Sequence, residues 1–155
     1  MTKDQLILNL LYTEWELLQA AVNTLQLSVR KCQVIGIKES YTFEELESFD
    51  SLTSKFNRTS DMFTQKVLRT IWMLLHEPFA PFIDMMNNCE KIGILQSADQ
   101  MIEIRDLRNQ IAHEYLPDAI RELVPETIEL SASLLENIGT CKLLIQARGW
   151  IEKSE

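Results

Sequence analysis

Residues 3–31 read KDQLILNLLYTEWELLQAAVNTLQLSVRK, and their apolar side chains recur at steps of three and four. This spacing places the apolar side chains on one face of an α-helix, which turns once in roughly 3.6 residues. The stretch therefore predicts a long first helix, from Lys3 to about Lys31, that buries one face against other helices. The members of this face are Ile7, Leu11, Trp15, Leu18, Val22, Leu25 and Val29.

A second apolar set lies beside the first on the same helix and consists of Leu6, Leu10, Leu17 and Ala21. Together the two sets are wider than the face that a helix needs for packing within one bundle. A second buried contact, such as a dimer interface, would account for the additional width.

The pattern stops between Gln33 and Ser40, a segment that contains Gly36. Thr42, followed by Glu44 and Glu45, then has the composition of a helix N-terminus. The helix that begins there is expected to run to about His76 and to stop at Pro78 and Pro81. Its predicted core face consists of Phe49, Leu52, Phe56, Phe63, Val67, Ile71 and Leu74.

A polar interruption breaks this core face, because Thr59 and Ser60 stand between Phe56 and Phe63. Asn57, Arg58 and Asp61 flank them. Such an interruption can line a cleft, and it can also form a hydrogen-bonded or solvated turn.

The C-terminal half predicts three further segments. A short helix covers Pro81 to Lys91 and ends at Gly93, and Ser97 caps the next helix, which ends close to Tyr115 or Leu116 because Pro117 follows. Residues 118–123 are expected to form a turn or a short helix. Pro125, which suits a first helical turn, is expected to open the last long helix, ahead of Gly149 and the charged tail at residues 152–155.

The whole chain thus predicts one all-α domain, residues 1–155, built as an up-and-down antiparallel bundle of four long helices and one short one. The composition agrees, since glycine and proline occur only four times each among 155 residues. No stretch approaches the roughly 20 apolar residues of a membrane span, and the N-terminus does not resemble a signal peptide, so a cytoplasmic location is expected.

Cys32, Cys89 and Cys141 are widely spaced and form no CxxC pair, so we expect buried apolar fillers rather than a disulfide framework or a zinc site. No motif for a metal or an organic cofactor is present, and none is expected. The formal charge of −8 argues against broad affinity for nucleic acid. Any contact with RNA must therefore be local.

Residues 108–115, RNQIAHEY, carry the candidate site. An imidazole can move protons and a guanidinium can stabilise the charge that gathers on phosphorus, so Arg108 and His113 have the chemistry of a metal-free ribonuclease. Asn109 lies one helical turn before His113, where its amide can hydrogen-bond and orient the ring. On an ideal helix Arg108 and His113 point about 140° apart. A distortion before Pro117, or a second copy of the chain, would be needed to close the site.

These residues resemble the motif of the HEPN superfamily, and within it the HepT toxins of HEPN/MNT toxin-antitoxin modules. Arg108, Asn109, His113 and Tyr115 match the motif position by position. The resemblance implies a homodimer of HEPN-like bundles in which two motifs meet and cut RNA without metal. His113 would act in acid-base catalysis during attack of the ribose 2′-hydroxyl, and Arg108 would stabilise the transition state. A minimal nucleotidyltransferase antitoxin would neutralise the toxin by transferring AMP to Tyr115.

Two other interpretations remain open. In the first, the protein is a non-catalytic helical partner that presents a nucleotide or substrate to a minimal nucleotidyltransferase, as the low basic charge would favour. In the second, it is a dimerising bundle in which the motif is structural. Arg108 would then pair with a carboxylate one helical turn away, Asn109 would face water, and His113 and Tyr115 would be half-buried residues at the helix end.

Overall fold

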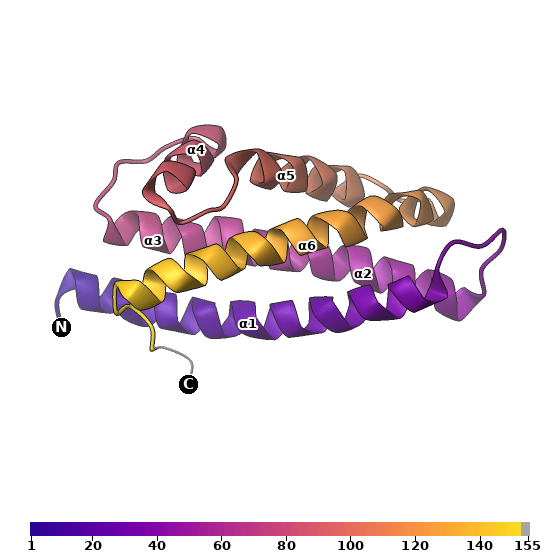
Figure 1. Ribbon diagram of the computed structural model, residues 1–155, viewed down its shortest axis with the longest axis horizontal. Coiled ribbons are helices and arrows are strands. Elements are labelled where there is room, and N and C mark those ends of the chain that lie inside the picture. Colours follow the sequence, from indigo (N-terminus) through magenta and orange to yellow (C-terminus); the bar gives the residue numbers. More distant parts are fainter. Residues whose placement is uncertain (153–155) are drawn as a thin grey trace.

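The computed structural model describes residues 1–152, and within them the chain forms an all-helical bundle (Figure 1). Four long helices and one short helix pack together, as predicted. Three of the assigned segments are consecutive and form one continuous helix. The segments are α1 (Lys3–Ile35), α2 (Phe43–Asp61), the π-helical η1 (Met62–Val67), α3 (Leu68–Leu74), α4 (Phe82–Ile92), α5 (Ala98–Ala112) and α6 (Pro117–Ala147).

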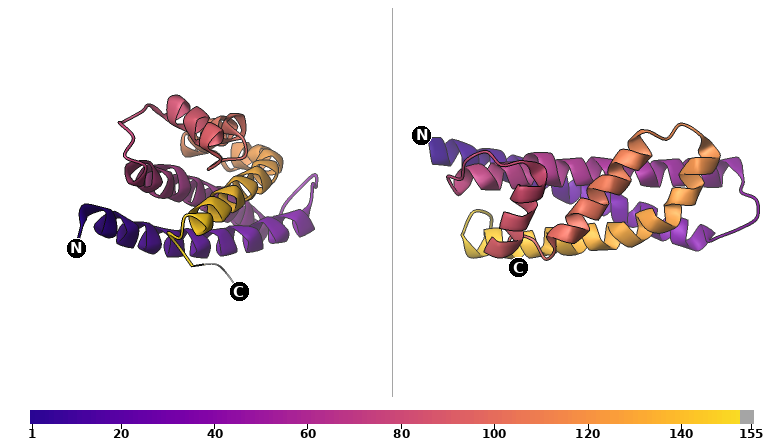
Figure 2. Two further views of the ribbon diagram at one scale, coloured as in Figure 1. Left: turned by 60° about the vertical axis from the view of Figure 1, so that its left-hand side comes forward. Right: turned by 90° about the horizontal axis from the view of Figure 1, so that it is seen from above.

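The continuous helix formed by α2, η1 and α3 lies at the centre of the bundle. Helix α1 packs along one side of it, and α4 and α5 lie together on the other side (Figures 1 and 2). Helix α6 runs back across the bundle and packs against α2, α5 and α1. The side chains that the sequence assigned to the core, such as Leu18, Phe56 and Phe63, are completely buried.

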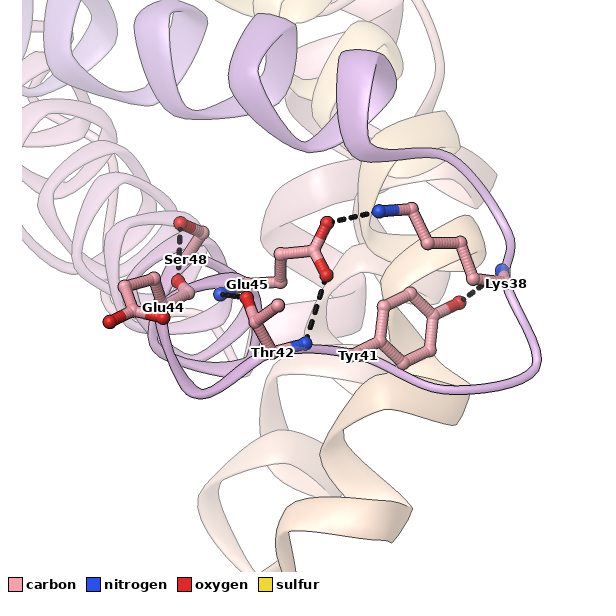
Figure 3. A network of polar contacts seen from close by, with 6 residues as sticks. All are labelled: Lys38, Tyr41, Thr42, Glu44, Glu45 and Ser48. Carbon is pink, nitrogen blue, oxygen red and sulfur yellow. Dashed lines mark hydrogen bonds and ion pairs between the residues drawn. The ribbon is translucent and has the colours of Figure 1, made fainter.

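The start of α2 shows how local sequence fixes a helix end. The Thr42 hydroxyl accepts a hydrogen bond from the Glu45 N–H at 3.2 Å, and the Glu45 carboxylate accepts one from the Thr42 N–H at 2.9 Å (Figure 3). The second carboxylate oxygen of Glu45 pairs with Lys38. The hydrogen bond from Lys38, and then the one from Thr42, lower the pKa of Glu45. This reciprocal capping confirms the predicted N-terminus.

The predicted boundaries around the two later prolines are wrong. Helix α6 begins at Pro117 rather than at Pro125, which lies inside the helix. Pro117 occupies the first helical turn, where a missing N–H leaves no hydrogen bond unmade, and burial of Ile120 and Val124 holds the added turns to the bundle. Helix α5 ends at Ala112, three residues before Tyr115, and His113 is its C-cap residue, with φ −95° and ψ −2°.

Two other features agree closely with the sequence. Gly93 ends α4 in the left-handed region at φ 94°, and the Ser97 hydroxyl caps α5 by accepting from the Gln100 N–H at 3.2 Å. The three cysteines are buried free thiols, as expected. Burial raises the pKa of the Cys89 thiol to about 12.

One face of α1 remains uncovered. Leu6, Leu10 and Leu17 expose 58%, 46% and 53% of their surface, whereas Ala21 is half-buried. Helix α1 lies on the side of the bundle opposite α5 (Figure 1). The expected dimer contact at this face remains a prediction. No helix in residues 1–152 has an apolar run long enough to cross a bilayer.

Asn137 joins α6 to the segment between α4 and α5. Its side chain is completely buried, and its Oδ1 accepts from the N–H groups of Gln96 and Ser97, both at 3.0 Å. Its Nδ2 donates to the Gln100 side chain at 2.9 Å and to the Ser133 carbonyl at 2.8 Å. The amide thus makes the four hydrogen bonds that an asparagine side chain can make.

We expect the Asn137→Ala variant to lose at least about 2 kcal/mol of unfolding free energy, because two main-chain N–H groups lose their acceptor and a cavity forms. Thr140→Ala removes an exposed hydroxyl from the same helix and is the matched control, with an expected change below about 0.5 kcal/mol. Urea denaturation followed by circular dichroism measures both values. Equal stability of the two variants would contradict the role assigned to Asn137.

Candidate functional site

Arg108 projects from α5 onto the end of α2. Its Nε and Nη2 donate to the two carboxylate oxygens of Asp61 at 2.9 and 2.8 Å, and the Asn57 amide donates to the Arg108 carbonyl at 3.3 Å. The hydrogen bonds that Arg108 donates to Asp61 raise the pKa of Arg108 above its usual value. Side-chain and main-chain contacts therefore both dock α5 onto α2 at this residue, and the paired carboxylate comes from a different helix.

The π-helical turn η1 begins directly after Asp61. Ahead of it, Thr59 and Ser60 are buried, and the Thr59 hydroxyl donates to the Lys55 carbonyl at 2.8 Å. Within the turn, the Thr64 hydroxyl donates to the Ser60 carbonyl at 2.9 Å. Such side-chain bonds to carbonyl groups compete with the regular helical ladder and distort it. Wide turns of this kind often occur at functional sites.

A cleft of about 140 Å³ opens between the end of α2, η1, α3, α4 and α5. We call it the arginine cleft, because Arg69, Arg105 and Arg108 line it together with Asp61. Ser60 also lines the cleft, so one residue of the polar interruption contributes to a cleft. The other, Thr59, is buried and hydrogen-bonded to the Lys55 carbonyl. The remaining lining residues are Thr64, Gln65, Phe82 and Asn109.

The arginine cleft carries more positive charge than the acidic sequence around the motif would suggest. The sequence between Ser97 and Pro125 contains twice as many acidic residues as arginines, namely Arg105, Arg108 and Arg121 against Asp99, Glu103, Asp106, Glu114, Asp118 and Glu122. The fold places Arg69 of α3 beside Arg105 and Arg108, and only one carboxylate, that of Asp61, lines the cleft. The site is thus locally positive although the chain is acidic overall.

His113 lies outside this cleft, at the C-cap of α5, and its side chain is exposed. Its main-chain N–H donates to the Asn109 carbonyl at 3.2 Å. Within residues 1–152 no hydrogen bond joins the Asn109 amide to the His113 ring, so the expected orienting contact is not formed. The reason is geometric: the helix ends before His113, and Asn109 lines the arginine cleft instead.

Tyr115 is 85% exposed, and it borders a different cavity of about 380 Å³ at the start of α2. Phe43, Leu46 and Ile120 supply apolar surface there. One copy of the chain therefore distributes Arg108, His113 and Tyr115 over the arginine cleft, an exposed helix end and an apolar cavity. This distribution agrees with the wide angle predicted between Arg108 and His113. The exposure of His113 and Tyr115 differs from the half-buried positions of the structural interpretation.

Comparisons of the chain with known protein families, with curated proteins and with solved structures give no match. They identify no family, and they leave an all-helical domain as the established description. The resemblance of residues 108–115 to HEPN toxins is accordingly the basis of a proposal. Within residues 1–152 no group of three or more His, Cys, Asp or Glu side chains is placed to hold a metal ion.

Sequence reasoning missed Asp61 as the partner of Arg108, and it missed Arg69 as part of the site. Asp61 was visible only as one flank of the polar interruption. Arg69 carried no signal, because it lies within a helix at no motif position. A contact between residues far apart in sequence depends on how the helices pack, which local periodicity does not specify.

We expect a double-mutant cycle of Arg108→Ala and Asp61→Ala to give a coupling of about 1 kcal/mol, because the pair is bidentate and its side chains are about one-third exposed. The control cycle uses Arg121 and Asp118, whose exposed charges lie 3.9 Å apart, with an expected coupling below about 0.5 kcal/mol. Unfolding free energies in urea measure both. If the coupling between Arg108 and Asp61 is no larger than that of the control pair, the bidentate ion pair does not stabilise the packing of α5 on α2.

Proposed function

We propose that this protein is a metal-independent endoribonuclease toxin whose catalytic residues are Arg108 and His113. The observation that supports the proposal most directly is the state of the Arg108 guanidinium. Asp61 fixes its plane through Nε and Nη2, and no hydrogen bond within residues 1–152 engages Nη1. An oriented guanidinium with free N–H groups in a locally positive cleft is suited to hold a phosphate group.

The exposed ring of His113 supports the proton-transfer role. No hydrogen bond within the described residues occupies either ring nitrogen, so both are accessible to a substrate. In the proposed reaction the imidazole takes the proton of the ribose 2′-hydroxyl as its oxygen attacks phosphorus. The bond from phosphorus to the 5′-oxygen breaks, and the leaving oxygen receives a proton from water, while the imidazolium returns its proton to solvent. Products are a 2′,3′-cyclic phosphate and a 5′-hydroxyl.

The splayed positions of Arg108 and His113 support a homodimeric active unit, in which the second chain would supply the missing half of each site. A partner that joins the two motifs has to contact the α5–α6 end of the bundle. Leu116 exposes 66% of its surface there and offers apolar contact area.

Tyr115 is the proposed control point. Its accessible hydroxyl lies two residues after His113, and a minimal nucleotidyltransferase antitoxin would transfer AMP to it. The added phosphate and adenosine would place negative charge and bulk beside the catalytic histidine and hinder RNA binding.

A second candidate function is that of a non-catalytic partner that binds a nucleotide for such a nucleotidyltransferase. The bidentate ion pair between Arg108 and Asp61 favours this non-catalytic function, because the Asp61 carboxylate already neutralises the charge of Arg108. The volume of the arginine cleft, about 140 Å³, lies below the roughly 300–1,000 Å³ of most small-molecule sites. This small volume argues against a nucleotide-binding function.

We expect purified protein to cleave single-stranded RNA in the presence of EDTA and to leave 2′,3′-cyclic phosphate ends. Arg108→Ala and His113→Ala should each lower the rate at least about 100-fold. His76→Ala is the control, because this second exposed histidine pairs with Asp4 at 3.3 Å and should be dispensable. Melting temperatures of all variants separate loss of catalysis from loss of fold.

Equal rates for wild type and His113→Ala would exclude the ribonuclease function. ATP binding by a protein that cleaves no RNA at high concentration would instead select the nucleotide-binding partner.

Coexpression with the cognate nucleotidyltransferase is expected to add one or more AMP units to the protein, all mapping to Tyr115. Intact mass and peptide mapping measure this modification. Tyr115→Phe should remain unmodified, whereas Tyr12→Phe, which alters another exposed tyrosine, should be modified normally. AMP on Tyr115→Phe would show that the hydroxyl of Tyr115 is not the acceptor.

A further inference from the structure

Two of the three arginines of the cleft, Arg69 and Arg105, are oriented by contacts that leave their charge uncompensated, whereas Asp61 pairs with Arg108. The Arg105 guanidinium lies 4.5 Å from the centre of the Phe82 ring, and Arg69 donates from Nη1 to the Ala80 carbonyl at 3.1 Å. An aromatic face or a carbonyl orients a guanidinium without cancelling its charge. Asp106 lies 3.8 Å from Arg105 but is largely exposed, so water screens it.

The segment between α3 and α4, residues 75–81, presents an aromatic ring beside this cleft. Phe79 is 84% exposed, and the Arg69 guanidinium lies 5.4 Å from the centre of its ring. The two carbonyls that flank Phe79 are both held: the Trp72 indole donates to the Pro78 carbonyl at 2.8 Å, and Arg69 holds that of Ala80. The main chain around Phe79 is thus held in place, and its ring lies in solvent rather than in the core.

A positive groove next to an exposed aromatic ring is the arrangement by which proteins bind single-stranded nucleic acid. Arginines contact the phosphates, and the ring stacks on a base that is free of a duplex. A duplex offers no free base to the ring, and the cleft, at about 140 Å³, is smaller than most sites that enclose a small molecule such as a nucleotide. The position of Phe79 beside Arg69 and Arg105 therefore favours a single strand of several nucleotides.

We propose that the arginine cleft binds the phosphodiester backbone of single-stranded RNA through Arg69 and Arg105, and that Phe79 stacks on an adjacent base. The inference rests on the proposed function, from which it takes RNA as the substrate class. It adds a binding surface outside the motif, formed by α3, the 75–81 segment and the first half of α5. The substrate strand then runs from Phe79 across Arg105 towards Arg108.

The test measures binding of a short fluorescent 2′-O-methyl oligonucleotide, which lacks the attacking hydroxyl, by anisotropy over a series of salt concentrations. Arg105→Gln should weaken binding and reduce the slope of log K against log salt by about 0.7, as expected for one lost phosphate contact on a single strand. Phe79→Ala should weaken binding at least about fivefold and leave the slope unchanged, because stacking releases no counterion.

Two matched controls carry the same side chains outside the cleft. Arg148, which lies 5.6 Å from the Trp150 ring, is changed to glutamine, and the exposed Phe43 is changed to alanine. Both variants should bind the oligonucleotide as the wild type does. Circular dichroism confirms that each variant is folded.

The proposal is overturned if the wild-type protein does not bind the oligonucleotide, if Arg148→Gln weakens binding as much as Arg105→Gln, or if a duplex binds equally tightly. Binding of ATP without binding of the oligonucleotide would also overturn it. Cleavage is not measured in this assay. A protein that binds through Arg105 and Phe79 but does not cut ordinary RNA would refute the ribonuclease function and support the binding site.

Discussion

The position of the site depends on the hydrogen bonds of one buried amide, that of Asn137. By holding Gln96 and Ser97, it fixes the point at which α5 begins. From this fixed start, α5 runs along α2 and places Arg108 beside Asp61. The bidentate contact between these two residues holds the C-terminal end of α5. Arg105 and Arg108 are three residues apart and therefore face the same cleft. The amide far from the motif thus orients the motif's arginine.

Much of the fold could be predicted from the sequence, because each long helix carries a recognisable apolar face and most helix ends carry a cap signal. Thr42, Gly93 and Ser97 act as the sequence predicts, since a cap depends on residues within one turn. The boundary at Pro117 could not be predicted in this way. A proline opens a helix and also tolerates a place inside one if packing compensates, so choosing between Pro117 and Pro125 requires knowledge of the tertiary contacts of residues 118–124.

The candidate site was predicted less completely than the fold. The motif drew attention to Arg108, His113 and Tyr115, and the structure leaves His113 and Tyr115 exposed. The residues that give the cleft its character, Asp61 and Arg69, come from another helix and belong to no local pattern. The hydrogen bond predicted between the Asn109 amide and the His113 ring is not formed. That prediction assumed that the helix continues through His113, whereas α5 ends at Ala112.

The π-helical turn η1 determines which side chains of the following helix reach the cleft. Trp72 stands nine residues after Phe63, and on an uninterrupted α-helix the two would point about 180° apart, yet both are buried. The wide turn accommodates one additional residue and rotates everything after it by about 100°. Arg69 follows this turn, so the direction in which its side chain leaves the central helix depends on the phase that η1 sets. The same side chain lines the arginine cleft.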